Sequence, residues 1–192
     1  MMRRLSLVLV AVLAPIPALA GFDCPGGGAV IRVVLLPQSF GGVDYCVPDK
    51  VDPSLLVTDP RTIICWQVDS MCQGEHTVSI IGDNTKANIN ASLACQPQYQ
   101  YPGPVSGDVS LICPPLPLGK YGYRVAVCLG NACASTDPGI WVNDGLAAPT
   151  PAELEASQAE VKRLHYGTRA DLEKTRKRTP AKKPAAPGGA KK

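Results

Sequence analysis

Apolar and polar residues alternate most regularly within residues 118–142. Tyr121, Tyr123, Val125 and Val127 share one parity, and glycine, arginine and alanine stand between them. A period of two residues is typical of a β-strand that turns one face towards a core. This stretch therefore predicts a half-buried strand around which the fold can be organised.

Cys128 and Cys133 follow that strand and bracket the loop Leu-Gly-Asn-Ala, whose glycine and asparagine favour a turn. Facing residues at the closed end of a hairpin have Cα atoms about 4.5–5.5 Å apart, which suits a disulfide. The pattern predicts a β-hairpin stapled by a Cys128–Cys133 bridge.

Shorter apolar or alternating runs, separated by Gly, Pro, Asn and Asp, predict the other strands. Trp66 shares a parity with Ile64 and Val68, so we expect it in the core, whereas residues 48–60 and 95–104 are expected to be connections. About seven short strands predict an all-β fold, an antiparallel β-sandwich. The strands are expected at 29–36, 43–47, 62–68, 76–81, 87–93, 109–113 and 140–142.

The N-terminal end differs in composition from residues 21–149, which contain the predicted strands and are called the body below. Residues 1–20 combine two arginines, an apolar run and a small-x-small motif at 18–20, which is typical of a signal peptide. Prolines end the apolar run well short of the roughly 20 residues that a membrane helix needs. We therefore expect an exported, secreted or periplasmic chain that begins at Gly21 and has no transmembrane segment.

The composition changes again at Thr150. Thr150 and Glu153 form a capping box with proline at the first helical position, which predicts a helical arm over 150–177 with Gly167 as its weak point. Residues 178–192 are rich in Lys, Pro, Ala and Gly and are predicted to be disordered.

All eight cysteines lie beyond the predicted signal peptide. An even number in an exported chain favours a disulfide framework, and the lack of Cys-x-x-Cys pairs disfavours a zinc site built from thiolates. The sequence cannot select among the many possible pairings. Proximity along predicted hairpins suggests, besides Cys128–Cys133, the pairs Cys65–Cys72, Cys24–Cys46 and Cys95–Cys113.

Charge is distributed unevenly. Residues 21–149 carry 6 basic and 11 acidic side chains, whereas residues 150–192 carry 11 basic and 5 acidic ones. A basic tail on an acidic body favours contact with an anionic glycan or an envelope or extracellular protein, although the charges could also serve solubility alone. The tail has no aromatic residue for base stacking after Glu173, so we do not expect sequence-specific nucleic-acid binding. The predicted polymer-binding residues are Lys174, Arg176, Lys177, Arg178, Lys182, Lys183, Lys191 and Lys192.

The hairpin region resembles a known fold family. The run Tyr-x-Val-x-Val at 123–127, the short loop and Ser135 resemble the penultimate strand and last hairpin of fibronectin type III domains. Trp66 resembles their core tryptophan, and Leu118 lies near the start of their tyrosine-corner motif. The resemblance covers 62–142 and implies an immunoglobulin-like or fibronectin type III-like sandwich, a fold that hosts many unrelated functions.

The sequence offers little for catalysis. His76 is the one histidine of the expected body, and we expect it to be exposed where a strand begins. Aspartates in turn-like segments favour turn geometry, but they leave open a small carbohydrate hydrolase with paired carboxylates. A secreted inhibitor that presents the stapled loop is another alternative. We predict a non-enzymatic binding or structural protein with no catalytic residue, cofactor or metal site, and the sequence does not indicate its oligomeric state.

Overall fold

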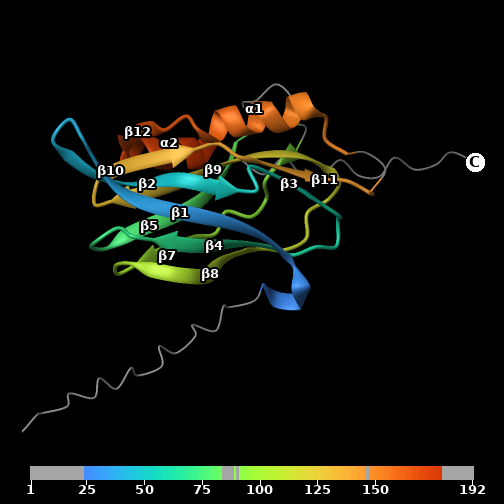
Figure 1. Ribbon diagram of the computed structural model, residues 1–192, viewed down its shortest axis with the longest axis horizontal. Coiled ribbons are helices and arrows are strands. Elements are labelled where there is room, and N and C mark those ends of the chain that lie inside the picture. The colour runs from blue at the N-terminus through green and yellow to red at the C-terminus, as the bar shows by residue number, and fades with distance from the viewer. Residues whose placement is uncertain (1–23, 84–88, 90, 146–147, 179–192) are drawn as a thin grey trace, which may run out of the picture.

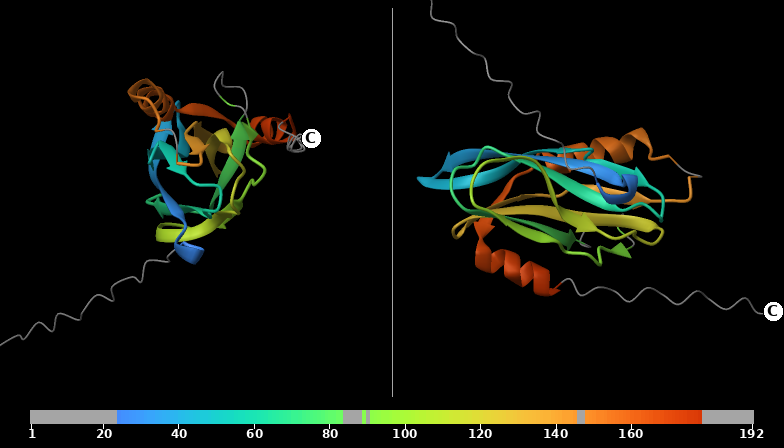
Figure 2. Two further views of the ribbon diagram at one scale, coloured as in Figure 1. Left: turned by 90° about the vertical axis from the view of Figure 1, so that its right-hand side faces the viewer. Right: turned by 90° about the horizontal axis from the view of Figure 1, so that it is seen from below.

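The computed structural model of the chain describes residues 24–83, 89, 91–145 and 148–178. Two β-sheets pack face to face around one apolar core, and two α-helices from the C-terminal part lie against them (Figure 1 and Figure 2). One turn of 3-10 helix, η1 (Pro25–Gly27), precedes the first strand. The predicted signal peptide, residues 1–20, lies outside the described residues.

The first sheet has the strand order β2-β1-β4-β8. β1 and β2 form a long hairpin closed by Gly41 and Gly42, which have φ angles of 61° and 77°. These positive values suit glycine because it has no Cβ atom to clash. The strands are β1 (Ala29–Phe40), β2 (Val43–Asp52), β4 (Ile64–Ser70) and β8 (Val105–Cys113).

The second sheet is built around β9. β5 pairs along one side of β9, and β10 and β11 share the other side. β12 and β3 extend the sheet beyond β10 and β11, while β7 pairs with β5 and β6 with β9. The strands are β3 (Leu55–Thr58), β5 (His76–Asp83), β6 (Ala91–Ser92), β7 (Gln98–Tyr101), β9 (Gly119–Leu129), β10 (Ala132–Thr136), β11 (Gly139–Val142) and β12 (His165–Thr168).

The sheets are mixed, so the prediction of purely antiparallel pairing is wrong. β1 runs parallel to β4, β3 to β11, and β6 to β9. The chain leaves the first sheet after β2, forms β3 in the second sheet and returns as β4, and such a crossover permits parallel pairing. Residues 48–60 and 95–104, expected to be connections, therefore contain β3 and β7.

The alternation in β9 produces the predicted core face. Tyr121, Tyr123, Val125 and Val127 are buried between the sheets. Trp66 of β4 is fully buried, and its ring centroid lies 5.6 Å from that of Tyr123 in an edge-on arrangement. Burial raises the pKa of Tyr123, and the Trp66 indole partly offsets this rise. The predicted core position of Trp66 is confirmed.

All eight cysteines form disulfides. The Cys128–Cys133 and Cys95–Cys113 pairs are confirmed, whereas the expected Cys24–Cys46 and Cys65–Cys72 pairs are wrong. The remaining bridges join Cys24 to Cys65 and Cys46 to Cys72. β1 lies between β2 and β4, and its parallel register with β4 brings Cys65 beside the residues that precede β1. Sheet order, not proximity along the chain, determines these two bridges.

The C-terminal part is not one helix, so the arm predicted over 150–177 is wrong in its middle. α1 (Pro151–Val161) begins with the predicted capping box. The chain then forms β12, which pairs antiparallel with the edge of β10, and continues as α2 (Arg169–Arg178). An open strand edge offers unpaired N–H and C=O groups, which β12 satisfies. Gly167, the expected weak point, faces Cys133 in this ladder.

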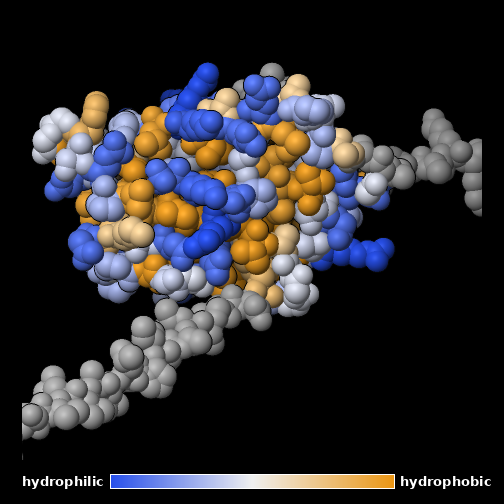
Figure 3. Space-filling model, viewed as in Figure 1, coloured by the Kyte–Doolittle hydropathy of each residue, from blue (hydrophilic) through white to orange (hydrophobic). Residues whose placement is uncertain are grey.

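The outer faces of the two sheets differ. On the first sheet, apolar and polar surface is interleaved and open to solvent (Figure 3). Arg32 of β1 and Asp69 of β4 form an ion pair there with an Nε–Oδ2 distance of 2.6 Å. On the outer face of the second sheet, α2 instead lies against part of β5 and β9 (Figure 2).

Candidate functional site

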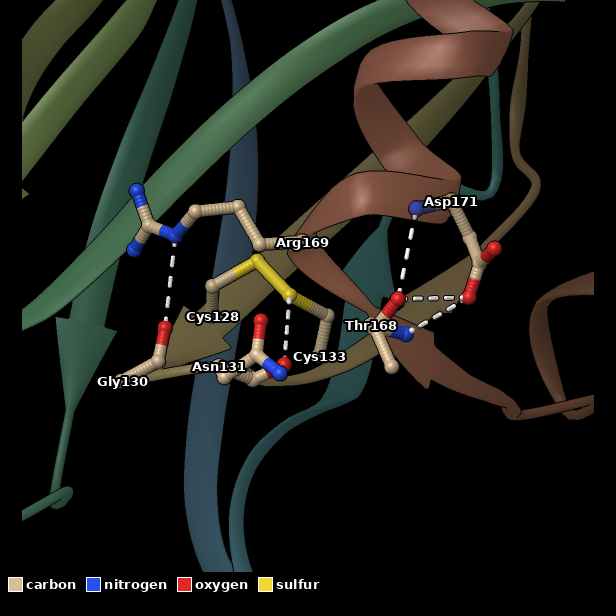
Figure 4. Close-up of a disulfide and its surroundings, with 7 residues drawn as sticks. All are labelled: Cys128, Gly130, Asn131, Cys133, Thr168, Arg169 and Asp171. Atoms are coloured by element: carbon tan, nitrogen blue, oxygen red, sulfur yellow. Dashed lines mark hydrogen bonds between the residues drawn. A yellow bond between two sulfur atoms is a disulfide. The ribbon is translucent and has the colours of Figure 1, made fainter.

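The stapled hairpin is covered by the chain's own C-terminal segment (Figure 4). Cys128 faces Cys133 in the ladder between β9 and β10, with Cα atoms 4.1 Å apart. The backbone N–H of Arg169 donates to the carbonyl of Asn131 (3.2 Å), and its Nε donates to the carbonyl of Gly130 (3.3 Å). The loop that closes the hairpin therefore binds the start of α2.

Further contacts hold α2 along the sheet. Leu172 lines a narrow gap together with Thr77 and Cys128, which places this apolar side chain against β5 and β9. Near the end of the helix, the Arg176 guanidinium donates to the carbonyl of Gln96 (3.0 Å). One of the predicted polymer-binding residues is thus engaged with the body.

The other predicted tail residues fall into two groups. Lys174, Lys177 and Arg178 are exposed on α2, and Lys174 forms an ion pair of 3.9 Å with Asp171. Hydrogen bonds from Thr168 lower the pKa of Asp171, because they stabilise its charged form. The remaining four, Lys182, Lys183, Lys191 and Lys192, lie outside the described residues.

A groove of about 330 Å³ lies between α1 and the strands β9 and β11. Tyr121 and Ile140 contribute to its apolar lining, and the Lys120 Nζ lies 4.2 Å from the Trp141 ring centroid. Lys120 also pairs with Glu153 of α1. The hydrogen bonds from Lys120 and then Thr150 lower the pKa of Glu153 to about 2. Sequence reasoning missed this groove because its lining comes from β3, β9, β11 and α1, and no local pattern indicates how these elements pack.

A polar cluster lies where β10, α1 and β12 meet. Arg124 of β9 donates to Asp137 (2.9 Å) and lies 3.4 Å from a carboxylate oxygen of Asp83. The Nε2 of His165 lies 3.2 Å from the other Asp137 oxygen, and Glu160 of α1 is close to both. Sequence reasoning placed His165 in a helix, where the contact with Asp137 could not be foreseen.

His76 is buried, so the expectation that it is exposed is wrong. Its Nε2 lies 2.9 Å from Ser70 Oγ and its Nδ1 lies 3.0 Å from the carbonyl of Gly74, so both ring nitrogens have hydrogen-bonding partners. The ring also stacks on Tyr101 at a centroid distance of 5.6 Å. These contacts give His76 a structural role at the start of β5.

Two of the aspartates expected in turn-like segments, Asp59 in a loop and Asp69 in β4, have partners of their own. Asp59 accepts hydrogen bonds from the Arg61 backbone N–H (2.7 Å) and the Thr62 hydroxyl (2.8 Å), and these bonds lower its pKa. Burial raises the pKa of Asp69, but hydrogen bonds from Arg32 and Gly107 outweigh burial and bring it below its usual value. The expected turn role is confirmed at Asp59.

No protein-family model matches the chain, and no curated protein is similar to it. Within the described residues, neither α-helix has the length and apolarity that crossing a membrane requires. Four disulfides are typical of proteins in oxidising, non-cytoplasmic compartments.

Proposed function

We propose that this chain is an exported, non-enzymatic binding or structural protein of immunoglobulin-like fold, which holds an anionic polymer of the envelope or extracellular space through its basic C-terminal region. The observation that carries the proposal is the anchoring of α2. Arg169 and Arg176 fix the helix to the stapled hairpin and to the segment before β7. A rigid body thereby presents the cations that follow.

The cations on the outside of α2 are placed to meet a partner. Lys174, Lys177 and Arg178 are exposed, and the sequence contains no acidic residue after Glu173. The body has the opposite charge, since residues 21–149 carry 11 acidic and 6 basic side chains. A polyanion would therefore be attracted to the C-terminal region and repelled by the body.

Two contacts support the immunoglobulin-like part of the proposal: a ring pair in the core and a hydrogen bond near the start of β9. The edge-on pair of Trp66 and Tyr123 lies between the sheets. The Tyr121 hydroxyl donates to the carbonyl of Pro117 (2.7 Å), four residues upstream. A tyrosine that bonds back to nearby backbone is typical of the tyrosine corner in such sandwiches. The residue in this role is Tyr121, two positions before the tyrosine of the sequence resemblance.

The stapled loop is a poor candidate for an inhibitory loop, because Arg169 binds its Gly130 and Asn131 carbonyls. The carboxylates of Asp59 and Asp69 are held by turn and cross-strand partners. These contacts favour a binding role over the inhibitor and hydrolase alternatives.

The test is co-sedimentation of residues 21–192 with isolated anionic envelope polysaccharide. A variant with Lys174, Lys177 and Arg178 changed to Gln should bind more weakly, and removal of 179–192 should weaken binding further. A matched variant with Arg32, Lys50 and Arg61 changed to Gln loses the same charge from exposed positions of the body and should bind as the parent does.

Salt gives an independent criterion. The Debye length falls from about 10 Å at 0.1 M to about 3 Å at 1 M, so electrostatic retention should be lost over that range. Equal retention of all four proteins, or retention that does not respond to salt, would leave the charges with a solubilising role and overturn the proposal.

A further inference from the structure

We propose that Asp137, Glu160 and His165 form a binding site for a divalent first-row transition metal ion, with Zn²⁺ as the best match. Asp137 directly follows β10, Glu160 lies in the last turn of α1, and His165 begins β12. One ligand atom from each residue lies within 4.8 Å of the others. The site is distinct from the proposed polymer-binding cations and does not depend on them.

The donor set selects the metal. One imidazole nitrogen and two carboxylate oxygens suit Zn²⁺, whereas Ca²⁺ takes six to eight oxygen ligands. Cysteine thiolates, which often bind zinc, cannot compete with these residues for the ion, because all eight cysteines are in disulfides. The Nε2 of His165 and the Oδ2 of Asp137 are already 3.2 Å apart. That separation is close to the roughly 3.4 Å between two ligands of a tetrahedral ion with metal–ligand distances of about 2.1 Å.

Glu160 can complete the set by a small movement. Its side chain is 27% exposed, and it forms an ion pair of 3.7 Å with Arg163, whose side chain is 71% exposed. An ion pair with so exposed a partner contributes little to stability, so a divalent ion can replace it. The Glu160 carboxylate oxygen lies within 4.8 Å of the other two ligand atoms. Rotation of the glutamate side chain can bring it to the roughly 3.4 Å that a tetrahedral ion requires.

Arg124 acts as a supporting residue and not as a competitor. Its Nε holds the Oδ1 of Asp137, while the contact with His165 uses Oδ2. Ligating carboxylates in metal sites commonly have a second hydrogen bond of this kind, which orients them. With the ion pairs of Asp83 and Arg163 included, three carboxylates face two guanidinium groups. This excess of negative charge favours a cation.

Space for an exchangeable ligand is present next to the cluster. A cavity of about 90 Å³, lined by Arg124, His165 and residues of α2, opens on this side, and the His165 side chain is 46% exposed. Three protein ligands leave the fourth position of a tetrahedral ion to water. A bound ion would join α1, β10 and β12, and thus hold the C-terminal segment to the sheet.

The experiment uses residues 21–192 without an affinity tag, freed of metal with a chelator and titrated with Zn²⁺ in a calorimeter. We expect one ion per chain. His165→Gln should weaken binding by about 100-fold or more, and Glu160→Gln by about 10-fold or more. Glu155→Gln, an exposed carboxylate on the same helix, should leave the affinity unchanged.

Two readouts separate a ligand from a merely structural residue. At a Zn²⁺ concentration about 100 times the Kd, the melting temperature of the parent should rise by about 5–10 °C, and that of His165→Gln should not. In NMR spectra of the imidazole nitrogens, Zn²⁺ should shift His165 and leave buried His76 unchanged. No detectable binding to the parent, or equal binding by His165→Gln, would overturn the proposal.

Discussion

The two faces of the second sheet are held by different forces. On the inner face, Tyr123, Val125 and Val127 of β9 are fully buried against the first sheet. On the outer face, the same strand presents Arg124 and Cys128, which line narrow gaps together with residues beyond position 150. Burial of apolar area stabilises the inner face, whereas hydrogen bonds and ion pairs dominate the outer one.

The contacts of the C-terminal segment are largely polar, although Tyr166 also packs on the rings of Phe40 and Tyr45. Ser157 donates to the Ser54 carbonyl (2.6 Å), and Thr136 donates to the Val161 carbonyl (2.6 Å). Val161 is the one residue of this segment that belongs to the buried core among the described residues. Since the rest of the described segment lies outside that core, the segment should open without global unfolding. The comparison therefore predicts the largest global effects from inner-face mutations, and smaller or local effects from outer-face ones.

The largest expected effect is that of Trp66→Ala. Its indole is fully buried against Tyr123, so its removal leaves a large cavity between the sheets. We expect a loss of about 3–5 kcal/mol in unfolding free energy, measured by urea denaturation with the disulfides intact. Trp141→Ala is the control, because Trp141 is half-buried in the groove beside α1. Equal losses in the two variants would contradict the proposed difference.

Arg124→Gln should have the next largest effect. Arg124 forms ion pairs with two buried carboxylates, those of Asp83 and Asp137, and its own side chain is 22% exposed. Breaking a buried ion pair costs about 3–5 kcal/mol, and partial exposure reduces our expectation to about 2–3 kcal/mol. Arg32→Gln is the matched control on the open sheet face, where the pair with Asp69 is more exposed. There we expect less than about 1 kcal/mol, and a reversed order would refute the comparison.

The features that could be predicted are those encoded by neighbouring residues. The period of two in β9 predicted its core face, the spacing of Cys128 and Cys133 predicted their bridge, and Thr150 with Glu153 predicted the start of α1. These patterns could be read because each depends on a few adjacent positions.

Features set by the order of strands in space could not be predicted. The Cys24–Cys65 bridge requires β1 to lie parallel to β4, which no local pattern reports. His165 belongs to β12 because the edge of β10 accepts a strand, although the surrounding composition favours a helix. The polar cluster and the groove beside α1 were missed for the same reason.

A smaller and more local effect is expected from Arg169→Ala. The variant keeps the backbone bond to Asn131 but loses the Nε bond to Gly130. We expect amide hydrogen exchange in α2 and β12 to accelerate about fivefold, which corresponds to one net hydrogen bond, while the amides of β9 keep their rates. Lys177→Ala, at an exposed position of the same helix, should leave both sets unchanged. Faster exchange in β9 would mean that α2 and the core open together.

The smallest effect concerns the groove, where Glu153 joins α1 to β9. Lys120 and Thr150 lower the pKa of Glu153 from 4.5 to about 2. A carboxyl group whose folded-state pKa is lowered stabilises the fold fully above its unfolded-state pKa, and this contribution disappears as the pH falls through the folded-state value. The stabilisation by Glu153 should therefore be present above pH 4.5 and decline between pH 4.5 and about 2.

Asp59, Asp69 and Asp171 also have lowered pKa values, so the acid sensitivity of the parent alone cannot isolate this contact. The measured quantity is the difference in melting temperature between the parent and Glu153→Gln. That difference should be largest at neutral pH and shrink towards zero as the pH approaches 2. Glu155→Gln, exposed on the same helix, should show a small difference without this decline. A Glu153→Gln difference that stays constant from pH 7 to 2 would show that the carboxylate charge does not stabilise the contact with Lys120.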